Sequence, residues 1–137
     1  MDESSEMKIS FRKGLPGFEG IKEFVLRDNP GSIFYWLIGL PENQVRFLLV
    51  DPFVFFPKYT FDLDDRDKEN LIIENPRDVL VFAIVSIPEK VSLATANLLA
   101  PIIINRTTWE GQQVILENSP YTTKHRLFEN DRLVKEG

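Results

Sequence analysis

The sequence predicts a mainly β, single-domain, antiparallel β-barrel-like fold with one or two short helices. Short apolar segments alternate with Gly, Pro and Asn turn signals at spacings of about ten residues, which is typical of an antiparallel sandwich or barrel. The chain has 137 residues, of which 43% are hydrophobic and 12% aromatic. This length and composition suit one domain with a substantial core.

Four strands are expected in the first part of the chain. Residues 1–6 are acidic and polar, and we expect them to form a flexible tail ahead of a β-domain over residues 7–128. The first strand is expected at Met7–Phe11, where apolar and polar residues alternate. Turn clusters then separate three further strands, expected at Phe24–Leu26, Ile33–Ile38 and Val45–Val50.

A helix and a central strand are expected next. Asp64–Asn70 carries acidic residues in its first turn, which favours a short helix. Residues 79–87 are almost continuously apolar and end at Pro88. Such a run predicts a central strand that is buried on both faces.

The last part of the chain is expected to be extended. Ser92–Leu99 is ambiguous, but its Thr and Asn content and the Pro that follows favour extended structure over helix. Ile102–Asn105 and Gln113–Glu117 read as the two strands of a hairpin. Residues 129–137 are charged and are expected to form a C-terminal tail.

Composition and charge argue against several classes of function. The net charge of −5 disfavours direct binding of nucleic acid and favours a basic protein partner or simple solubility. The chain has no Cys, which excludes disulfides and thiolate metal sites. No apolar run approaches the roughly 18 residues needed to cross a membrane, and the N-terminal residues do not resemble a secretion signal. We therefore expect a cytoplasmic protein without a cofactor.

The sequence also lacks the groups that an enzyme or a metal site needs. The only histidine, His125, lies between Lys124 and Arg126, and no serine has the surroundings of a hydrolase nucleophile. The acidic run that begins at Asp62 fails as a calcium loop, because Asp67 stands where such loops need Gly and Ile73 where they need Glu. We expect neither catalysis nor a bound metal.

The segment from Asp51 to Tyr59 is the first candidate contact region. It holds Phe53, Phe55 and Phe56 between two prolines, and is either a corner of the core or a contact surface. If the side chains alternate as in a strand, Phe53 and Phe55 share one face and Phe56 takes the other. One face is then expected to pack into the core, which leaves an aromatic anchor for a partner.

An acidic stretch follows this aromatic segment. Residues 62–78 contain seven acidic and three basic residues, and this local charge is close to that of the whole chain. A charged run is commonly only a solvated face. The functional alternative is an acidic rim beside the aromatic segment that steers a basic partner.

Four segments, in this order and spacing, resemble the FliW family of flagellar assembly factors over about residues 8–128. They are Gly14–Glu19, Val50–Tyr59, Thr95–Asn105 and Tyr121–His125. The resemblance implies a compact β-barrel-like fold and a cytoplasmic, non-enzymatic regulator. It also implies two protein partners, the translational repressor CsrA and flagellin, which compete for the factor so that repression of flagellin translation is relieved or restored.

A second candidate surface lies in the third of these segments. Its polar ends frame an apolar stretch, which suggests a groove or an exposed sheet edge that Pro101 keeps open. The alternative is a buried strand between two turn asparagines. We predict that charge reversal at Asn97 or Asn105 abolishes partner binding and leaves the fold intact. The candidate residues are Asn97, Leu98, Pro101, Ile102 and Asn105, together with Phe53, Phe55, Phe56 and Tyr59.

A small-molecule-binding β-barrel is the alternative function. The phenylalanines of the chain could surround a metabolite, and a dry, filled barrel interior would count against this reading. A pull-down that recovers a basic repressor or flagellin would favour the regulator.

Overall fold

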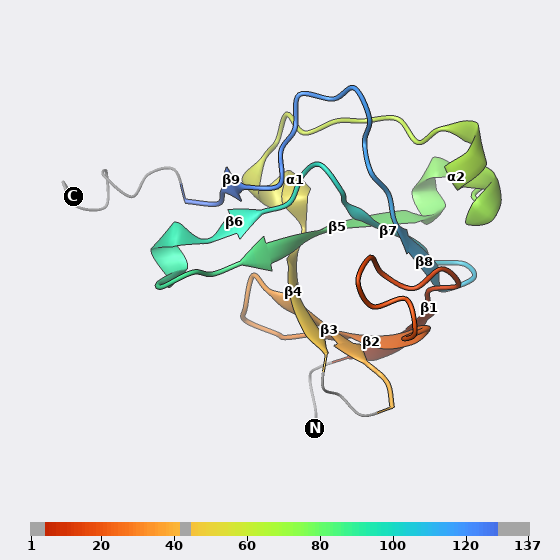
Figure 1. Cartoon of the computed structure of the whole chain (residues 1–137), viewed down its shortest axis with the longest axis horizontal. Coiled ribbons are helices and arrows are strands. Elements are labelled where there is room, and N and C mark those ends of the chain that lie inside the picture. Colours follow the sequence, from red (N-terminus) through yellow and green to blue (C-terminus); the bar gives the residue numbers. More distant parts are fainter. Residues whose placement is uncertain (1–4, 42–44, 129–137) are drawn as a thin grey trace.

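The computed structural model describes residues 5–41 and 45–128. The fold is mainly β: seven strands form a closed barrel, and two short strands extend the sheet on one side (Figure 1). Two short helices, α1 and α2, lie in the connection between β4 and β5. None of the helices in the described ranges is long and apolar enough to cross a lipid bilayer.

The order of the barrel strands is β4-β3-β2-β1-β8-β7-β5, and β4 pairs with β5 to close the ring. Beyond β5, the sheet continues through β6 to β9. The strands are β1 (Glu6–Ser10), β2 (Glu23–Asp28), β3 (Tyr35–Gly39), β4 (Arg46–Val50), β5 (Val79–Ser86), β6 (Thr95–Ala96), β7 (Ile102–Asn105), β8 (Glu110–Gln113) and β9 (His125–Arg126).

All but one of these strand pairs are antiparallel, as the sequence predicts. The exception is the contact between β1 and β8, which is parallel and joins Ser10 to Glu110. The backbone N–H of Ser10 donates to the carbonyl of Trp109 over 3.0 Å at this junction. Two segments a hundred residues apart therefore complete the ring, and local hydrophobic alternation carries no information about such a contact.

Two hydrophobic cores follow from the alternation of side chains along the strands. The inner core fills the barrel and includes Ile9, Phe11, Leu15, Phe24, Leu37, Leu49, Phe82, Ile102 and Ile104. The outer core lies between the β4–β5–β7 wall and the segments that cover it. It includes Val50, Tyr59, Leu71, Ala83, Val85, Ala96, Leu98, Ile103, Val114, Leu116 and Leu127.

The predicted helix at Asp64–Asn70 is confirmed as α2 (Asp65–Asn70). Asp64 caps it by accepting a hydrogen bond from the Asp67 N–H over 2.8 Å, and the acidic residues of its first turn match the helix dipole. The other helix, α1 (Pro52–Phe55), falls in the aromatic segment, so its side chains do not alternate as in a strand.

The predicted central strand is confirmed as β5, which pairs with β4 on one side and with β6 and β7 on the other. Burial on both faces is less complete than expected, because Val79 and Val81 stay half-buried. The strand that is fully buried on both faces is β7. Its Ile102 and Ile104 enter the inner core, while Ile103 enters the outer one.

The predicted hairpin needs a correction in its second strand. That strand is β8 at Glu110–Gln113, and it is not the predicted Gln113–Glu117. The turn closes early because the Trp109 N–H bonds the Asn105 carbonyl over 2.7 Å, with Trp109 at a φ of +60°. Gly111 then fits where any Cβ would meet the ring of Phe11 at 2.8 Å.

Two further expectations are corrected in part. The segment Ser92–Leu99 is extended only in β6, because a single 3-10 turn occupies Val91–Leu93. The expected N-terminal tail ends earlier than predicted, since Glu6 already pairs with Arg27 in the β1–β2 ladder. The remaining tail predictions fall on residues 1–4 and 129–137, which lie outside the described residues.

Candidate partner-binding surface

The aromatic segment forms a helical turn, so the strand-like alternation considered for it from the sequence does not occur. The Asp51 carboxylate accepts a hydrogen bond from the Phe53 N–H over 2.9 Å, and Pro52 occupies the first position of α1. An Asp cap followed by Pro favours a helix start, because Pro has the required φ and no N–H to leave unpaired. Phe53 and Val54 are consequently exposed, whereas Phe55 and Phe56 pack against the outer core.

Tyr59 is the centre of an aromatic cluster on this side of the molecule. Its ring packs against Phe53 at 5.7 Å, Phe61 at 5.3 Å and Tyr121 at 4.7 Å between ring centroids. Its hydroxyl donates to the Leu98 carbonyl over 2.8 Å. Burial, with a smaller effect from Tyr121, raises the pKa of the Tyr59 phenol well above its ordinary value. The hydroxyl therefore stays protonated and joins its own segment to that of Leu98, while the ring joins both to the segment of Tyr121.

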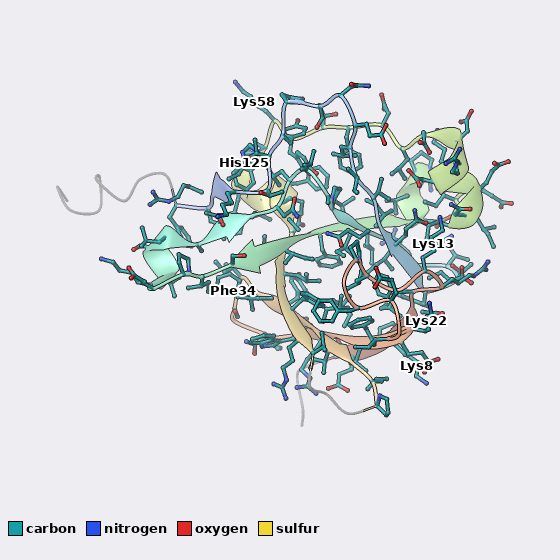
Figure 2. The ribbon with its side chains drawn as sticks, viewed as in Figure 1. Lys8, Lys13, Lys22, Phe34, Lys58 and His125 are labelled. Carbon is teal, nitrogen blue, oxygen red and sulfur yellow. The ribbon has the colours of Figure 1, made fainter. Side chains whose placement is uncertain are left out.

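His125 belongs to the same cluster and has a packing role. Its ring lies 5.9 Å from Phe56 and 6.0 Å from Tyr121, and its Nε2 accepts a hydrogen bond from the Thr122 N–H over 2.9 Å. Figure 2 shows His125 near Lys58, well apart from Lys8, Lys13 and Lys22 on the β1 side of the molecule. Across residues 5–41 and 45–128, no three His or acidic side chains are grouped in a way that could hold a metal ion.

Asn97 shapes the chain between β6 and β7. Its side-chain oxygen accepts hydrogen bonds from the Leu99 N–H (3.1 Å) and the Ala100 N–H (3.0 Å). The side chain is half-buried and acts as an acceptor in both bonds. Asn97 therefore forms a turn, as the alternative reading of this segment predicted.

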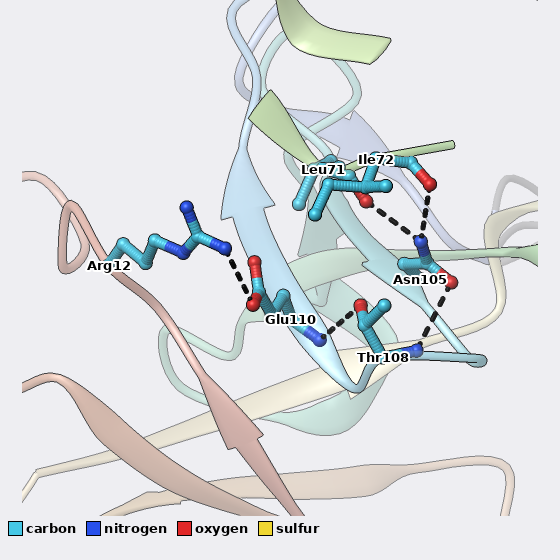
Figure 3. A network of polar contacts seen from close by, with 6 residues as sticks. All are labelled: Arg12, Leu71, Ile72, Asn105, Thr108 and Glu110. Atoms are coloured by element: carbon cyan, nitrogen blue, oxygen red, sulfur yellow. Dashed lines mark hydrogen bonds and ion pairs between the residues drawn. The ribbon is translucent and has the colours of Figure 1, made fainter. Parts of the chain in front are cut away.

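Asn105 is buried, with 2% of its surface exposed. Its amide nitrogen donates to the carbonyls of Leu71 (2.7 Å) and Ile72 (3.1 Å), and its oxygen accepts from the Thr108 N–H (3.4 Å) (Figure 3). The oxygen also accepts from the Thr107 N–H (2.8 Å). This network fastens the end of α2 to the β7–β8 turn. This network counts against the prediction that charge reversal at Asn105 leaves the fold intact, because a charged side chain cannot both donate to the two carbonyls and accept from the two N–H groups.

The proposed open edge along β7 also needs a correction. β7 pairs with β5 on one side and with β8 on the other, so it has no free edge. Leu98, Pro101 and Ile102 are buried. The structure matches the alternative, a buried strand flanked by asparagines, and a role for these residues in partner binding stays an untested prediction.

A groove opens beside Tyr59, and we call it the outer groove. It has a volume of about 540 Å³, and its floor is the outward face of β5 at Val79 and Val81. Apolar side chains form most of its walls, which are contributed by Phe53, Tyr59, Phe61, Leu63, Ile73 and Pro76. Two of the predicted contact residues, Phe53 and Tyr59, thus meet in one concave site.

The acidic stretch borders the outer groove. Asp62 and Glu74 line it, with Lys68 as the one basic residue among the lining side chains. Farther along, Gln112 of β8 donates to Asp67 over 2.9 Å and ties α2 to the barrel. The Asp67 N–H lowers the pKa of Asp64, while burial, aided by the charge of Asp64, raises the pKa of Asp67. The stretch is both a solvated helix and a rim of the groove.

Sequence reasoning missed part of this groove. Phe61 and Leu63 continue the alternation that begins at Tyr59. This period-two pattern in the sequence could have predicted that they lie on the same face as Tyr59. Ile73 and Pro76 had no such signal, because only the return of the chain from α2 to β5 brings them opposite Phe61.

Comparisons with known proteins agree over most of the chain. A family model described as FliW protein matches residues 1–127. The flagellar assembly factor FliW of Moorella thermoacetica is 49% identical over an alignment of 124 positions, which covers 88% of this chain and 77% of that protein. That of Bacillus subtilis strain 168 is 43% identical over 128 residues, covering 93% of this chain and 90% of the relative.

A solved structure gives the same result. The chain superposes on a crystal structure of the flagellar assembly factor FliW with a TM-score of 0.86 and 40% sequence identity. The match covers 90% of this chain and 87% of the other.

Proposed function

Because the chain belongs to the FliW family of flagellar assembly factors, we propose that it is a non-enzymatic cytoplasmic regulator that works by binding other proteins. Its proposed partners are a CsrA-type translational repressor and flagellin. Binding of the repressor frees flagellin translation, and unassembled flagellin competes for the factor and restores the repression. The resulting partner switch responds by mass action to the amount of free flagellin.

The observation that carries the proposal is the outer groove with its exposed aromatic anchor. Phe53 is 43% exposed at the groove, and Tyr59 forms a rigid wall behind it. Aromatic residues in concave, mostly apolar sites are common anchors of protein interfaces. The neighbouring carboxylates of Asp62 and Glu74 suit a positively charged partner, as an RNA-binding repressor is expected to be.

The alternative, a barrel that stores a small molecule, is less well supported. The inner core is packed with side chains from the strands of the ring, and Ile9, Phe24, Leu37 and Leu49 among them have no exposed surface. A ligand that is held inside a β-barrel needs an open interior, which a core of this kind does not offer.

The proposal is tested with purified chain, repressor and flagellin. We expect each protein to bind the chain alone, and flagellin to displace the repressor in size-exclusion chromatography and calorimetry. Phe53→Ser should weaken binding of at least one partner by about tenfold or more, because it removes an anchor. Val54→Ser is the matched control, since Val54 is the next residue of α1, is 67% exposed and does not line the groove.

A stable complex that contains all three proteins would contradict the switch. Failure of both proteins to bind a correctly folded chain would contradict the proposed function as a whole.

A further inference from the structure

Strand β5 is paired over most of its length on one side but over a shorter stretch on the other. β7 lies opposite Val79–Phe82 and β6 opposite Val85–Ser86, both on the same side. On the opposite side, β4 pairs only with Ala83–Val85. Figure 1 shows β4 meeting β5 and continuing into α1, where the chain leaves the sheet.

Backbone hydrogen bonds show which N–H and C=O groups of β5 face the β4 side. The carbonyls of Asp78 and Ile84 accept bonds from Arg106 (2.8 Å) and Asn97 (2.9 Å), which both belong to the β6–β7 side. Successive residues of a strand direct their N–H and C=O groups to opposite sides, so Val79 and Val81 direct theirs to the β4 side.

One of these groups already has a partner, because the Val79 N–H bonds the Pro76 carbonyl. The Val79 carbonyl and both backbone groups of Val81 face a side on which residues 5–41 and 45–128 supply no paired strand. This short stretch, Val79–Val81, is the open edge of β5.

Apolar cavities flank the open edge on both faces of the sheet. The outer groove contains Val79 and Val81. On the inner face, Leu80 and Phe82 line the mouth of the barrel, a cavity of about 270 Å³ that also includes Tyr35. Side chains of an added strand alternate between faces, so one set would enter the outer groove and the other the barrel mouth.

The charges around the two cavities are mainly negative. Asp62 and Glu74 line the outer groove against one Lys68. Asp28 and Glu6 line the barrel mouth, and no basic residue of the described ranges lines it, but Glu6 is already ion-paired with Arg27 at 2.6 Å. An occupant with apolar residues at its centre and positive charges at its ends would complement both cavities.

We propose that the open edge of β5 at Val79–Val81 binds an extended segment of a partner protein by strand addition. The segment has about three successive apolar residues flanked by Lys or Arg, to match the length of the edge and the alternation of its side chains. The inference goes beyond the proposed function, because it assigns a recognition mode and a sequence pattern to a site, whichever protein supplies the segment.

The first test measures amide hydrogen exchange by NMR in the free chain. The Val81 amide should exchange at least about tenfold faster than the amides of Leu80 and Phe82, which face β7. Equal protection of Val81 would overturn the proposal. It would mean that the edge is already occupied. The occupant would be a second copy of the chain if the protection rises with protein concentration, and another part of the same chain if it does not.

The second test uses the peptide Lys-Lys-Val-Phe-Val-Lys-Lys, acetylated and amidated at its ends. It should bind the full chain and slow exchange at Val81. Two control peptides should bind at least about tenfold more weakly. One has Glu in place of every Lys, and the other is N-methylated at its three apolar residues, which removes the donors for strand pairing but keeps the side chains.

Variants of the chain locate the site. Val81→Lys should weaken binding of the peptide about tenfold or more, because it places a long charged side chain in the outer groove. If Val81→Lys does not fold, Val79→Lys replaces it in the same test. Ile115→Lys, at a 61% exposed position outside both cavities, should change the dissociation constant less than about twofold.

Equal binding of the N-methylated peptide, or binding that folded Val81→Lys and Val79→Lys variants do not weaken, would overturn strand addition at this edge. A chain that binds the repressor and flagellin but fails these tests keeps the proposed function and loses the edge site. A chain that binds the peptide but neither protein keeps the edge site and loses the proposed function.

Discussion

Two asparagines of the same motif segment have different roles in the structure. Asn97 uses only its side-chain oxygen, which caps the turn into Leu99 and Ala100. Asn105 uses both ends of its amide, donating to two carbonyls and accepting from two N–H groups. An amide can do both because it combines two N–H donors with an acceptor oxygen, whereas a carboxylate has no donor, an ammonium group no acceptor and a hydroxyl only one donor hydrogen.

This difference predicts opposite results for the same substitution. Asn97→Asp keeps the acceptor and should change the free energy of unfolding by less than about 0.5 kcal/mol. Asn105→Asp places a buried charge against the carbonyls of Leu71 and Ile72, and should cost about 3 kcal/mol or more. Urea denaturation of both variants at neutral pH measures the difference. Equal stability of the two variants would contradict the assigned role of Asn105.

The hairpin of β7 and β8 shows how a turn and a single missing side chain set the register of a strand. Trp109 adopts a positive φ and returns the chain within four residues of β7. Gly111 then passes over Phe11 and Ile9 of the inner core, where an added Cβ would lie 2.8 Å from the Phe11 ring and 3.1 Å from Ile9. The position of β8 thus depends on a contact with β1 and the loop after it.

Gly111→Ala should therefore destabilise the protein by about 1–3 kcal/mol, because Phe11 has no exposed surface and little room to move. Gly20→Ala is the matched control: an added Cβ meets nothing within 4 Å there, and the backbone is in an ordinary conformation. Thermal unfolding followed by circular dichroism compares the two. A Gly111→Ala variant as stable as Gly20→Ala would show that the core rearranges freely around β8.

The distribution of charge matters for the entire chain. The net charge is −5, and α2 with its flanking segments supplies most of it. Two of these carboxylates, Asp62 and Glu74, line the outer groove, where they act on an approaching partner through solvent.

Association with a basic partner should slow as salt is added. We expect the association rate constant to fall by roughly tenfold from about 0.01 M to 0.15 M salt, as steering by charge is screened. The double variant Asp62→Asn, Glu74→Gln should flatten this dependence, while Glu89→Gln, at the exposed β5–β6 turn, should not. Stopped-flow fluorescence measures the rates. A dependence that the double variant leaves unchanged would remove the groove carboxylates from the steering surface.

Several features of this fold were predictable from local patterns. Alternation and turn residues located β1 to β4 within a few residues, the continuous apolar run located β5, and the acidic first turn located α2. The motif segments identified the family. The Asp51-Pro52 pair is a local signal for the start of α1, but the run of phenylalanines that follows it suits a strand as well, so α1 was not predicted.

The sequence by itself determined the strand content, the acidic character and the family, since these depend on neighbouring residues and on motifs. Only the tertiary structure decided that Asn105 is buried, that β8 joins β1 in parallel, and that β4 stops short of Val81 and leaves part of β5 open. These features arise from contacts between segments far apart in the chain. Such contacts depend on closure of the ring and on the simultaneous packing of two cores, and no local sequence pattern encodes them.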